Sequence, residues 1–431
     1  MGTEMKDSGV EWIGKIPLNW AVKKLKYVAS ERTEQLLETT DPDYQFRYVE
    51  ISSVSEAEGI SKYEDMTFKI APSRARKKVQ IGDILISTVR TYLRAIAAVD
   101  DSDDVIVSTG FAVIRPVDIN PCFLKYATLS ESFISEIMAN SEGISYPSTT
   151  SNKILSQKIA LPSRFEQDKI AQYLDVECIR INHITSLLKE KIQKLKELKR
   201  SLISELVTKG LVPNVDLKDS GIEWIGKIPV DWKLSPLKNV FTVYAGSTPK
   251  SDISEYWDGD IVWVTPSDMD KSQKEIASSK KKITHKGYDS ANLTIVPSGS
   301  LILSTRAPVG TINISTTPLC TNQGCKSLVV KNCKTDVRFY YYFLSILDAP
   351  LNALSLGTTF LELSTRALES FQVPVPKHSM QRAISNYLDI KCSRIDNLID
   401  LETKFYEKLT EYKQSIIYEY VTGKKRVPQE V

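Results

Sequence analysis

The chain contains two copies of one sequence unit, and this duplication limits its architecture more than any other feature. Residues 6–17 read KDSGVEWIGKIP and residues 218–229 read KDSGIEWIGKIP, with one difference, Val10 against Ile222. A looser copy relates QDKIAQYLDVECIRI at 167–181 to QRAISNYLDIKCSRI at 381–395, about 214 residues later. Each half of the chain consists of a short repeated segment, then a variable segment, then a helix-like segment. So long a period predicts a duplicated domain unit and not a solenoid.

The first helix-like segment covers residues 163–212 and contains no Pro and one Gly, Gly210. Pro162 precedes it and Pro213 follows it, positions typical of helix ends. From Ile181 onward, apolar residues recur three or four positions apart, which predicts one apolar face. A helix of ~44 residues would be ~66 Å long at 1.5 Å per residue, which favours a coiled coil. The expected seam residues are Ile181, Ile184, Leu188, Ile192, Leu195, Leu198, Leu202 and Leu206.

The second helix-like segment, residues 377–427, repeats this pattern with no Pro and one Gly. Glu402 takes the place of Leu188 in the seam, and neighbouring Leu401 is expected to compensate. Each helix could pack on its own domain, but equal lengths and matching seams favour packing of the two helices on each other. The expected seam residues here are Ile395, Leu398, Tyr406, Leu409, Tyr412, Ile416 and Tyr420.

Four of the six tryptophans lie in or just after the short repeated segments. A Trp side chain provides a large contact area, so each short segment is expected to dock onto a fixed partner surface. Anchoring in the domain core is the alternative, and it explains these residues almost as well. The candidate docking residues are Trp12, Trp20, Trp224 and Trp232.

The two variable segments, about 21–160 and 233–375, have the pattern of mixed α/β domains. Apolar helix-like stretches occupy residues 123–138 and 337–350. The order of elements is shared whereas most residues differ, so one fold is expected to carry two different surfaces. We therefore predict an α/β (α+β) chain with two mixed domains and two long helices. The strand-like runs are 46–52, 83–88 and 105–109 in the first segment and 260–265, 300–305 and 327–331 in the second.

Composition excludes several classes of protein. Hydrophobic residues make up 42% and charged residues 25%, as in ordinary globular proteins. No apolar run approaches the 18 or more residues of a membrane span, and the N-terminus has no signal-peptide core, so we expect a cytoplasmic protein without a membrane partner. A net charge of +3 excludes a uniformly basic nucleic-acid coat but leaves room for local basic surfaces.

Catalytic and cofactor motifs are not found in the sequence. GVEWIGKI at 9–16 and its copy at 221–228 resemble a phosphate-binding loop, but Ile16 and Ile228 stand where Ser or Thr should bind Mg²⁺. The six cysteines form no C-x-x-C pair and the three histidines lie far apart, which disfavours a zinc site. We therefore expect no catalytic residue, no metal site and no cofactor bound by this chain.

Each variable segment contains one basic cluster close to a strand that ends in polar residues. Residues 69–94 contain seven Lys or Arg against one Asp, and residues 271–286 contain six Lys against one Glu. Such clusters suit phosphate contacts, while Arg can recognise guanine and Ser or Thr can reach phosphates or bases. For either cluster alone, the alternative to a binding site is a solvent-exposed loop. The candidate DNA-binding residues are Arg74, Arg76, Lys77, Lys78, Thr88, Arg90, Tyr92, Arg94, Lys280, Lys281, Lys282, Ser304, Thr305 and Arg306.

Together these features resemble the specificity subunit of type I restriction–modification systems over essentially the whole chain. The most specific elements are the doubled KDSG-x-EWIGKIP and LPSRFEQDKIAQYLD at 161–175, which is similar to the family's L-P-x-x-x-E-Q-x-x-I-x-x-L-D boundary. The second copy departs from this boundary because Met380 replaces Glu before Gln381. WVTPSDM at 263–269 and TNQGCKSL at 321–328 resemble stretches of the family's target-recognition domains.

The resemblance implies that each variable segment is a target-recognition domain that reads one half of a split double-stranded DNA site. It implies that the long helices form an antiparallel coiled coil that spaces these domains in pseudo-two-fold relation. Two methyltransferase subunits, carrying S-adenosylmethionine, would dock on this chain. Two motor–nuclease restriction subunits, using ATP and Mg²⁺, would join them.

The expected division is 1–160 for the first recognition domain, 161–212 for the central helix, 213–375 for the second domain and 376–431 for the C-terminal helix. Three other readings stay open. The chain could be a stand-alone DNA-binding repressor, the specificity part of a fused methylase, or a coiled-coil adaptor that binds no DNA. The missing cofactor motif disfavours enzymatic activity, and the paired basic clusters disfavour the adaptor.

Overall fold

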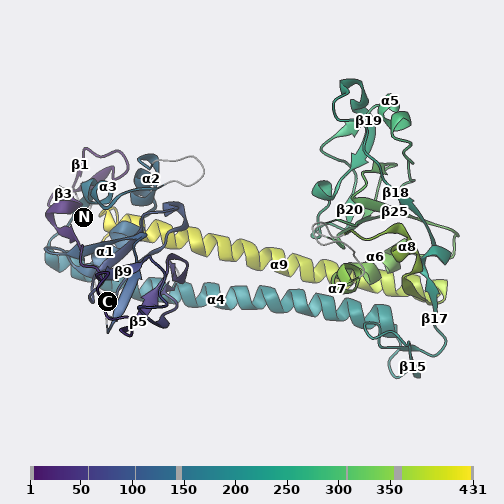
Figure 1. Cartoon of the computed structure of the whole chain (residues 1–431), viewed down its shortest axis with the longest axis horizontal. Helices are drawn as coiled ribbons and strands as arrows, with labels where there is room; N and C mark the ends of the chain where they lie inside the picture. The colour runs from purple at the N-terminus through teal and green to yellow at the C-terminus, as the bar shows by residue number, and fades with distance from the viewer. Residues whose placement is uncertain are drawn as a thin grey trace. The chain divides into compact units, whose positions relative to one another are not determined.

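The computed structural model describes residues 4–56, 58–101, 103–141, 148–306, 309–353 and 362–428. The chain divides into two compact units (Figure 1). Unit 1 consists of Met1–Lys191 and Glu402–Val431, and unit 2 consists of Ile192–Leu401. Each unit therefore contains one variable segment and one half of each long helix, so the helices are shared between the units and do not form separate domains.

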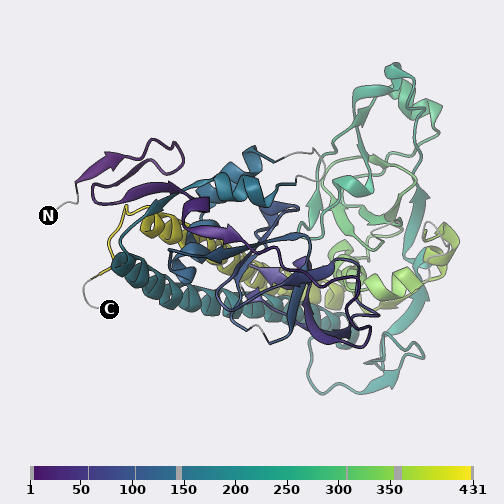
Figure 2. The same cartoon turned by 60° about the vertical axis from the view of Figure 1, so that its left-hand side comes forward.

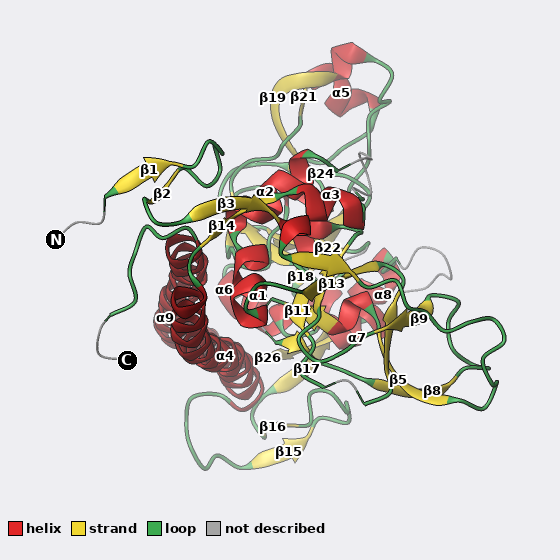
Figure 3. Cartoon of the chain, turned by 90° about the vertical axis from the view of Figure 1, so that its left-hand side faces the viewer, coloured by secondary structure: helices red, strands yellow, loops and turns green. Residues whose placement is uncertain are grey.

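The two long helices are α4 (Arg164–Lys209) and α9 (His378–Val421). In unit 1 the ring of Tyr173 on α4 lies 4.6 Å from the ring of Tyr420 on α9. In unit 2 Lys199 Nζ lies 2.7 Å from Asp396 Oδ1. A residue nearer the end of α4 thus contacts a residue nearer the start of α9, so the two helices are antiparallel, as expected. Figure 3 shows the two helices side by side.

Most of the expected seam residues are buried or half-buried, and three are exposed. Leu198, Leu398 and Tyr412 are 55%, 46% and 48% exposed. An α-helix drifts by about 20° per heptad against a 3.5-residue repeat, so a run of three-and-four spacings leaves the contact face. The buried seam residues are Ile181, Leu188, Leu206, Ile395, Ile416 and Tyr420, and the half-buried ones are Ile184, Ile192, Leu195, Leu202, Tyr406 and Leu409.

The polar interruption of the seam is accommodated by an ion pair. Leu401 is 62% exposed and does not compensate for Glu402. Instead, the Glu402 side chain is 13% exposed, and its Oε1 lies 2.6 Å from Lys191 Nζ on the facing helix. A charge partner thus replaces the apolar neighbour that the sequence pattern suggested.

The variable segment of unit 1 forms two four-stranded sheets. The first has the order β11 (Ile96–Ala98), β10 (Ile84–Ser87), β13 (Phe111–Pro116), β4 (Ala29–Glu31). The second has the order β8 (Glu64–Thr67), β5 (Gln45–Val49), β12 (Val105–Ser108), β9 (Ala75–Lys78), in which β12 and β5 are parallel. Helices α1 (Pro121–Leu129), α2 (Glu131–Ala139) and α3 (Ser151–Ser156) follow.

Unit 2 repeats this arrangement. Its first sheet has the order β18 (Phe241–Ala245), β25 (Cys325–Val330), β22 (Leu301–Ser304), β23 (Ile312–Ser315), β20 (Glu275–Ile276). Its second sheet has the order β21 (Lys282–Ile283), β19 (Trp257–Val264), β24 (Cys320–Thr321), and again one pair, β19 and β24, is parallel. Helices α5 (His285–Ser290), α6 (Val337–Ser345), α7 (Asp348–Ala353) and α8 (Thr365–Ser370) complete it. Five of the six expected strand runs are confirmed, whereas the run 46–52 is a strand only to Val49 and continues into a 3-10 helix at Ile51–Ser53.

The short repeated segments fold as hairpins, β1 (Met5–Asp7) with β2 (Lys15–Pro17) and β15 (Leu217–Asp219) with β16 (Lys227–Pro229). Figure 2 shows the first hairpin near the N-terminal label. Strands β3 (Ala21–Lys24) and β17 (Lys233–Pro236) then pair with β14 (Lys158–Leu161) and β26 (Gln372–Val375), which lead directly into the long helices. In the described ranges, no helix is long and apolar enough to span a membrane.

One glutamine in each unit joins the variable segment to its long helix. In unit 1 Gln167 Oε1 accepts the backbone N–H of Asn120 at 2.8 Å, and its amide donates to Pro162 O at 3.0 Å. In unit 2 Gln381 makes the same two bonds, with the N–H of Asp336 at 2.9 Å and Pro376 O at 2.8 Å. These bonds fix the start of α1 or α6 on the first turn of a long helix. They also give a physical reason for the Gln in the boundary motif.

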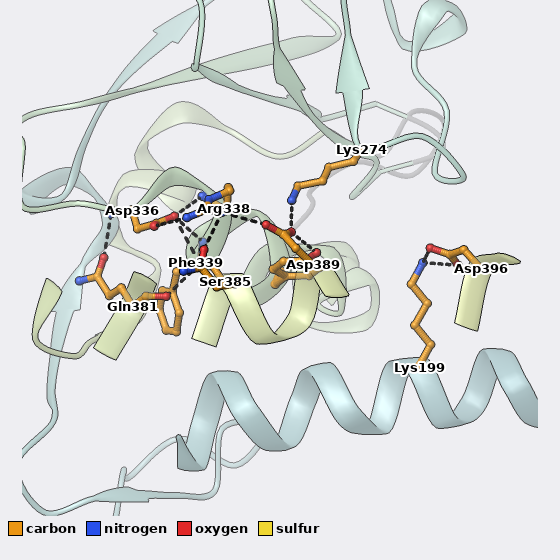
Figure 4. A network of polar contacts seen from close by, with 11 residues as sticks. Lys199, Lys274, Asp336, Arg338, Phe339, Gln381, Ser385, Asp389 and Asp396 are labelled. Atoms are coloured by element: carbon orange, nitrogen blue, oxygen red, sulfur yellow. Dashed lines mark hydrogen bonds and ion pairs between the residues drawn. The ribbon is translucent and has the colours of Figure 1, made fainter. Parts of the chain in front are cut away.

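Unit 2 adds a charged network around Asp389 of α9 (Figure 4). The Asp389 carboxylate accepts bonds from Tyr342 Oη at 2.6 Å, from Arg338 Nη1 at 2.9 Å and from Lys274. Burial acts to raise the pKa of Asp389, but the Lys274 and Tyr342 hydrogen bonds and the nearby cations lower it below its ordinary value. The corresponding Asp175 in unit 1 has two such partners, Lys125 and Tyr126. The second variable segment is therefore fixed to its helix by more charged contacts than the first.

Candidate nucleic-acid interface

In unit 1 the ends of three strands meet at one loop junction. Both the backbone N–H and the hydroxyl of Thr88, which follows β10, donate to Gly110 O, at 2.9 and 2.8 Å. The backbone N–H of Thr109, after β12, donates to Arg74 O at 2.8 Å. A Cβ at Gly110 would lie 2.5 Å from Ile51 Cδ1, so a larger residue here would displace the Ile51 side chain in the loop after β5. Junction 1 is defined as residues 50–53, 74, 88–90 and 109–110.

Unit 2 has the equivalent junction, built from other side chains. The N–H of Thr305 donates to Gly324 O at 2.8 Å, and the N–H of Asn322 donates to Val264 O at 2.9 Å. Gly324 is held close to Pro266, where a Cβ would lie 2.9 Å from Pro266 Cγ. Junction 2 is defined as residues 246–248, 265–268, 305–306 and 322–324. The shared Thr-to-Gly hydrogen bond marks the two junctions as copies of one backbone site.

Charge is polarised across the second sheet of unit 1. The edge strand β9 has the sequence Ala-Arg-Lys-Lys and adjoins junction 1. The opposite edge, β8, begins with Glu64 and Asp65. Near it Asp101 pairs with Arg47, at 2.8 Å between Oδ2 and Nη1. This distribution of charged residues would favour an anionic ligand at the β9 edge over the β8 edge.

Several candidate residues of unit 1 lie at the surface. Arg74, Lys78 and Arg90 are exposed, and Tyr92 is 44% exposed. Arg90 begins a 3-10 turn at φ +51°, a conformation that non-glycine residues rarely adopt and that is concentrated at functional sites. Thr88 uses its hydroxyl to hold junction 1 together. Junction 1 thus presents Arg74 and Arg90 around a strained loop, and Lys78 lies nearby on β9.

Three other candidates of unit 1 are engaged inside the unit. Lys77 Nζ donates to Phe111 O at 2.7 Å, and its side chain is 11% exposed. Arg94 pairs with Glu56, at 3.2 Å between Nη1 and Oε2, and with Glu131. Arg76 lies over the Phe68 ring, 4.7 Å from its centroid. The Lys77 and Arg94 side chains are therefore engaged within unit 1 and only 11% and 17% exposed.

In unit 2 Lys280, Lys281 and Lys282 are exposed, and Arg306 is half-buried with 44% of its side chain exposed. Lys280 adjoins junction 2, since its backbone N–H donates to Asp268 Oδ1 at 2.9 Å. Ser304 and Thr305 are fully buried, so their side chains cannot reach DNA, and the sequence assignment of both is wrong. Ser304 ends β22 and Thr305 follows it; all residues of this strand are buried, which the polar residue type did not reveal.

Sequence reasoning missed three exposed side chains at junction 2, those of Thr248, Ser267 and Gln323. Thr248 donates its hydroxyl hydrogen to Gln323, and Ser267 bonds Thr265 at 2.8 Å between hydroxyls. Gln and Ser are side chains that can recognise base edges. The stretches WVTPSDM and TNQGCKSL contain two of these residues, so the signal was present although no site residue was assigned from it.

The repeated tryptophans are mainly structural. Trp20 and Trp232 are 4% and 2% exposed, which corrects their assignment as docking anchors. Each covers a glycine at the end of a long helix, Gly423 at φ +73° and Gly210 at φ +82°. Trp12 and Trp224 are half-buried within their own units. Trp12 packs on Phe133, and Trp224 stacks on Phe371 with 4.9 Å between ring centroids.

In unit 1 a hydrogen bond also joins Trp20 to the long helix, and this bond allows a prediction about stability. The Trp20 indole N–H donates to Glu166 Oε1 at 3.2 Å, whereas Met380 occupies the equivalent position in unit 2. We expect Glu166→Met to lower the free energy of unfolding by ~1–2 kcal/mol, the cost of losing a hydrogen bond to a charged group. Urea denaturation measures this.

Met380→Leu, which preserves volume, is the matched control and should cost less than ~1 kcal/mol. In a Trp20→Phe background Glu166→Met should cost clearly less than in the wild type. An equal loss in both backgrounds would mean that the carboxylate acts through another contact.

The comparisons with known proteins agree with this geometry. A family model described as the type I restriction modification DNA specificity domain matches residues 17–197 and again residues 229–411. The matches cover most of the chain, so the protein belongs to the family of type I restriction–modification specificity subunits. These subunits are the non-catalytic components that give such systems their DNA sequence specificity.

Two relatives from Methanocaldococcus jannaschii are similar to the chain. The type I restriction enzyme MjaIX specificity subunit is 36% identical over 187 residues, which are 43% of this chain and 42% of the relative. The putative MjaX specificity subunit is 26% identical over 427 residues, 96% of each chain. A chain from a structural study of complex assembly and conformational transition in a type I system has a TM-score of 0.75, 25% identity and coverage of 95% and 99%. The HsdS subunit from Thermoanaerobacter tengcongensis has the same fold, with a TM-score of 0.51, 24% identity and coverage of 95% and 98%.

Proposed function

We propose that this chain reads an asymmetric, two-part DNA site, one half with each unit, and docks the methyltransferase and restriction subunits of a type I complex. The observation that supports this most directly is the repeated junction. The same backbone bond, from Thr88 to Gly110 and from Thr305 to Gly324, holds loops of different sequence. One scaffold with two sets of side chains suits two different half-sites.

The side chains at the two junctions have different recognition chemistry. Junction 1 and its neighbours offer Arg74, Lys78 and Arg90, which suit phosphates and guanine. Junction 2 offers Gln323 and Arg306, and glutamine suits adenine. The half-sites therefore differ, and the recognised site is not a palindrome.

Partner docking is supported by exposed apolar side chains on the outer faces of both long helices. They occur at positions that the repeat makes equivalent, Val176 with Ile390 and Leu187 with Leu401, each at least 50% exposed. Large exposed apolar side chains at helical spacing are typical of surfaces that bind partner helices. Two equivalent sets suit two copies of one methyltransferase subunit. S-adenosylmethionine would bind that partner, and ATP and Mg²⁺ would bind the two restriction subunits.

Co-expression with the methyltransferase subunit of the same system, followed by mapping of methylated adenines in the host genome, tests the proposal. We expect one split, asymmetric motif with a fixed gap and a stable complex. No methylated motif despite a stable complex would contradict the DNA-reading role. No motif and no complex would return the chain to the repressor or adaptor class.

Each unit should act on its own half-site, which can be tested with two arginine variants. We expect Arg90→Ala to weaken binding of the first half-site and Arg306→Ala to weaken binding of the second, each by ~1–3 kcal/mol of binding free energy. Each change should therefore lower the rate of methylation that depends on that half-site. The measurement is the methylation rate on duplexes carrying single changes in either half-site. Lys331→Met, on an exposed residue just after β25, is the charge-loss control. Unchanged rates and unchanged sequence preference for both arginine variants would exclude these residues as contacts.

A further inference from the structure

Two loops of junction 2 are packed backbone against backbone. The loop after β18 contains Gly246, where a Cβ would collide with the backbone oxygens of Thr321 and Asn322. The N–H of Ser247 donates to Thr321 O at 3.0 Å, and the indole N–H of the buried Trp263 donates to Ser247 O at 3.0 Å. Glycine allows two backbones to approach this closely, so each loop fixes the position of the other.

This packing brings two exposed polar side chains together. The Thr248 hydroxyl donates to Gln323 Oε1. Both side chains are exposed, so the Nε2 group of Gln323 can donate to a ligand. An amide oxygen has two lone pairs, and the bond to Thr248 uses one of them. Thr248 therefore fixes which end of the amide is the donor and which is the acceptor, and it leaves both ends able to bind.

Unit 1 has the same turn with a different residue at its tip. In each unit the side chain two residues before the junction glycine accepts the N–H of that glycine, Ser108 from Gly110 at 3.3 Å and Asn322 from Gly324 at 3.0 Å. The residue between them is exposed in both copies, and it is a threonine in unit 1 and Gln323 in unit 2. The turn is thus kept while its tip varies, as exchangeable base contacts on one scaffold require.

We propose that Gln323 reads an adenine of the second half-site and that Thr248 is the positioning residue that makes this reading selective against guanine. The inference rests on the proposed function, since it requires junction 2 to contact DNA. Adenine offers an N7 acceptor and an N6 donor in the major groove, which match Nε2 and the second lone pair of Oε1. Guanine offers two acceptors, N7 and O6. A free amide adapts to guanine by turning its Nε2 group toward both acceptors, and the Thr248 bond opposes that turn.

The test measures the affinity of the assembled complex of this chain and its methyltransferase subunit for duplexes of the mapped site. Each adenine is replaced in turn by guanine, with its paired base changed to match, and by 7-deazaadenine, which has C–H in place of the N7 acceptor. For wild type we expect one adenine at which guanine weakens binding about 10–100-fold and 7-deazaadenine also weakens it. Gln323→Ala should bind these duplexes within about twofold of the mapped site, because no amide is left to read the base.

The positioning role of Thr248 has its own expected result. Thr248→Val keeps the shape of the side chain and removes its hydroxyl. We expect it to weaken binding of the mapped site about 3–10-fold, because the Gln323 amide is then ordered only on binding. The preference for adenine over guanine at that position should fall as well. In the Gln323→Ala background Thr248→Val should change affinity less than about twofold.

Two further variants separate this mechanism from general effects. Thr335→Val is the matched control, because the Thr335 hydroxyl also donates to a side-chain amide oxygen of unit 2, Asn332 Oδ1 at 3.4 Å. It should leave affinity and base preference unchanged. Gln323→Thr installs the residue type that the same turn carries in unit 1, so the turn accommodates it. It should lose the adenine preference as Gln323→Ala does.

Two outcomes would overturn the proposal. An equal loss from Thr248→Val with and without Gln323 would show that Thr248 acts on DNA itself. An adenine preference that survives in both Gln323 variants, or a wild-type complex that responds to 7-deazaadenine at no position, would show that Gln323 reads no adenine. In either case a split, asymmetric methylation motif of the wild type leaves the proposed function standing, whereas the absence of such a motif contradicts that function itself.

Discussion

A complex whose specificity subunit lacks one heptad from each long helix should recognise half-sites that lie about three base pairs closer together. Seven helical residues span ~10.5 Å, and B-DNA advances ~3.4 Å per base pair. Residues 193–199 of α4 and 395–401 of α9 are suitable for removal, because Lys199 and Asp396 pair within these stretches. The adenine-methylation motif of the deletion variant gives the new gap directly.

The expected effect is large, since the original site should no longer be methylated. Deleting the heptad from α4 alone is the control, and it should disturb the antiparallel pairing and lower methylation at every spacing. Continued methylation of the original site by the double deletion would show that the helices do not set the distance.

Removing the carboxylate of Asp389 is expected to destabilise unit 2 by ~3 kcal/mol. Asp389→Ala leaves the Tyr342 hydroxyl and the Lys274 ammonium without their acceptor and takes one of the carboxylate partners of Arg338. Breaking one side of a partly enclosed charge network costs several kcal/mol, because the remaining charges stay desolvated. Urea denaturation of the full chain measures the loss.

Asp175→Ala is the matched variant in unit 1, and it should cost less because Asp175 has fewer donors. The pH dependence adds a check. The pKa of Asp389 is lower in the folded protein than its ordinary value, so its contribution is complete above that ordinary value, about 4. It is lost as pH falls through the folded pKa. The difference between wild type and Asp389→Ala should therefore shrink below about pH 4, and a constant difference would contradict the network.

The sequence was sufficient for the parts of the fold that depend on periodicity. The long helices, their packing on each other and the strand runs follow from apolar spacing and from Pro and Gly positions, whereas the antiparallel direction was implied by the family resemblance. Leu198, Leu398 and Tyr412 fit the spacing but lie outside the contact face. Their positions depend on the accumulated twist of two paired helices, which a local pattern does not specify.

The candidate DNA contacts were less predictable, because their availability depends on partners far away in the sequence. Lys77 and Arg94 look like other basic loop residues until Glu31, Phe111, Glu56 and Glu131 are brought beside them. Ser304 and Thr305 likewise look polar and accessible, but they close a buried strand. Residue type identified the right loops, whereas tertiary contacts decided which side chains stay open to a ligand.

The path of the chain through unit 1 has a consequence for its biosynthesis. The core of this unit contains Ile416, Ile417, Tyr420 and Val421 from the last turns of α9, and Trp20 packs on Gly423. The core of unit 2 uses one continuous stretch between Ile203 and Cys392. The unit that leaves the ribosome first is therefore completed last, after α9 has been synthesised. A premature stop between Cys392 and Ile416 would damage the first recognition domain and leave the core of the second intact.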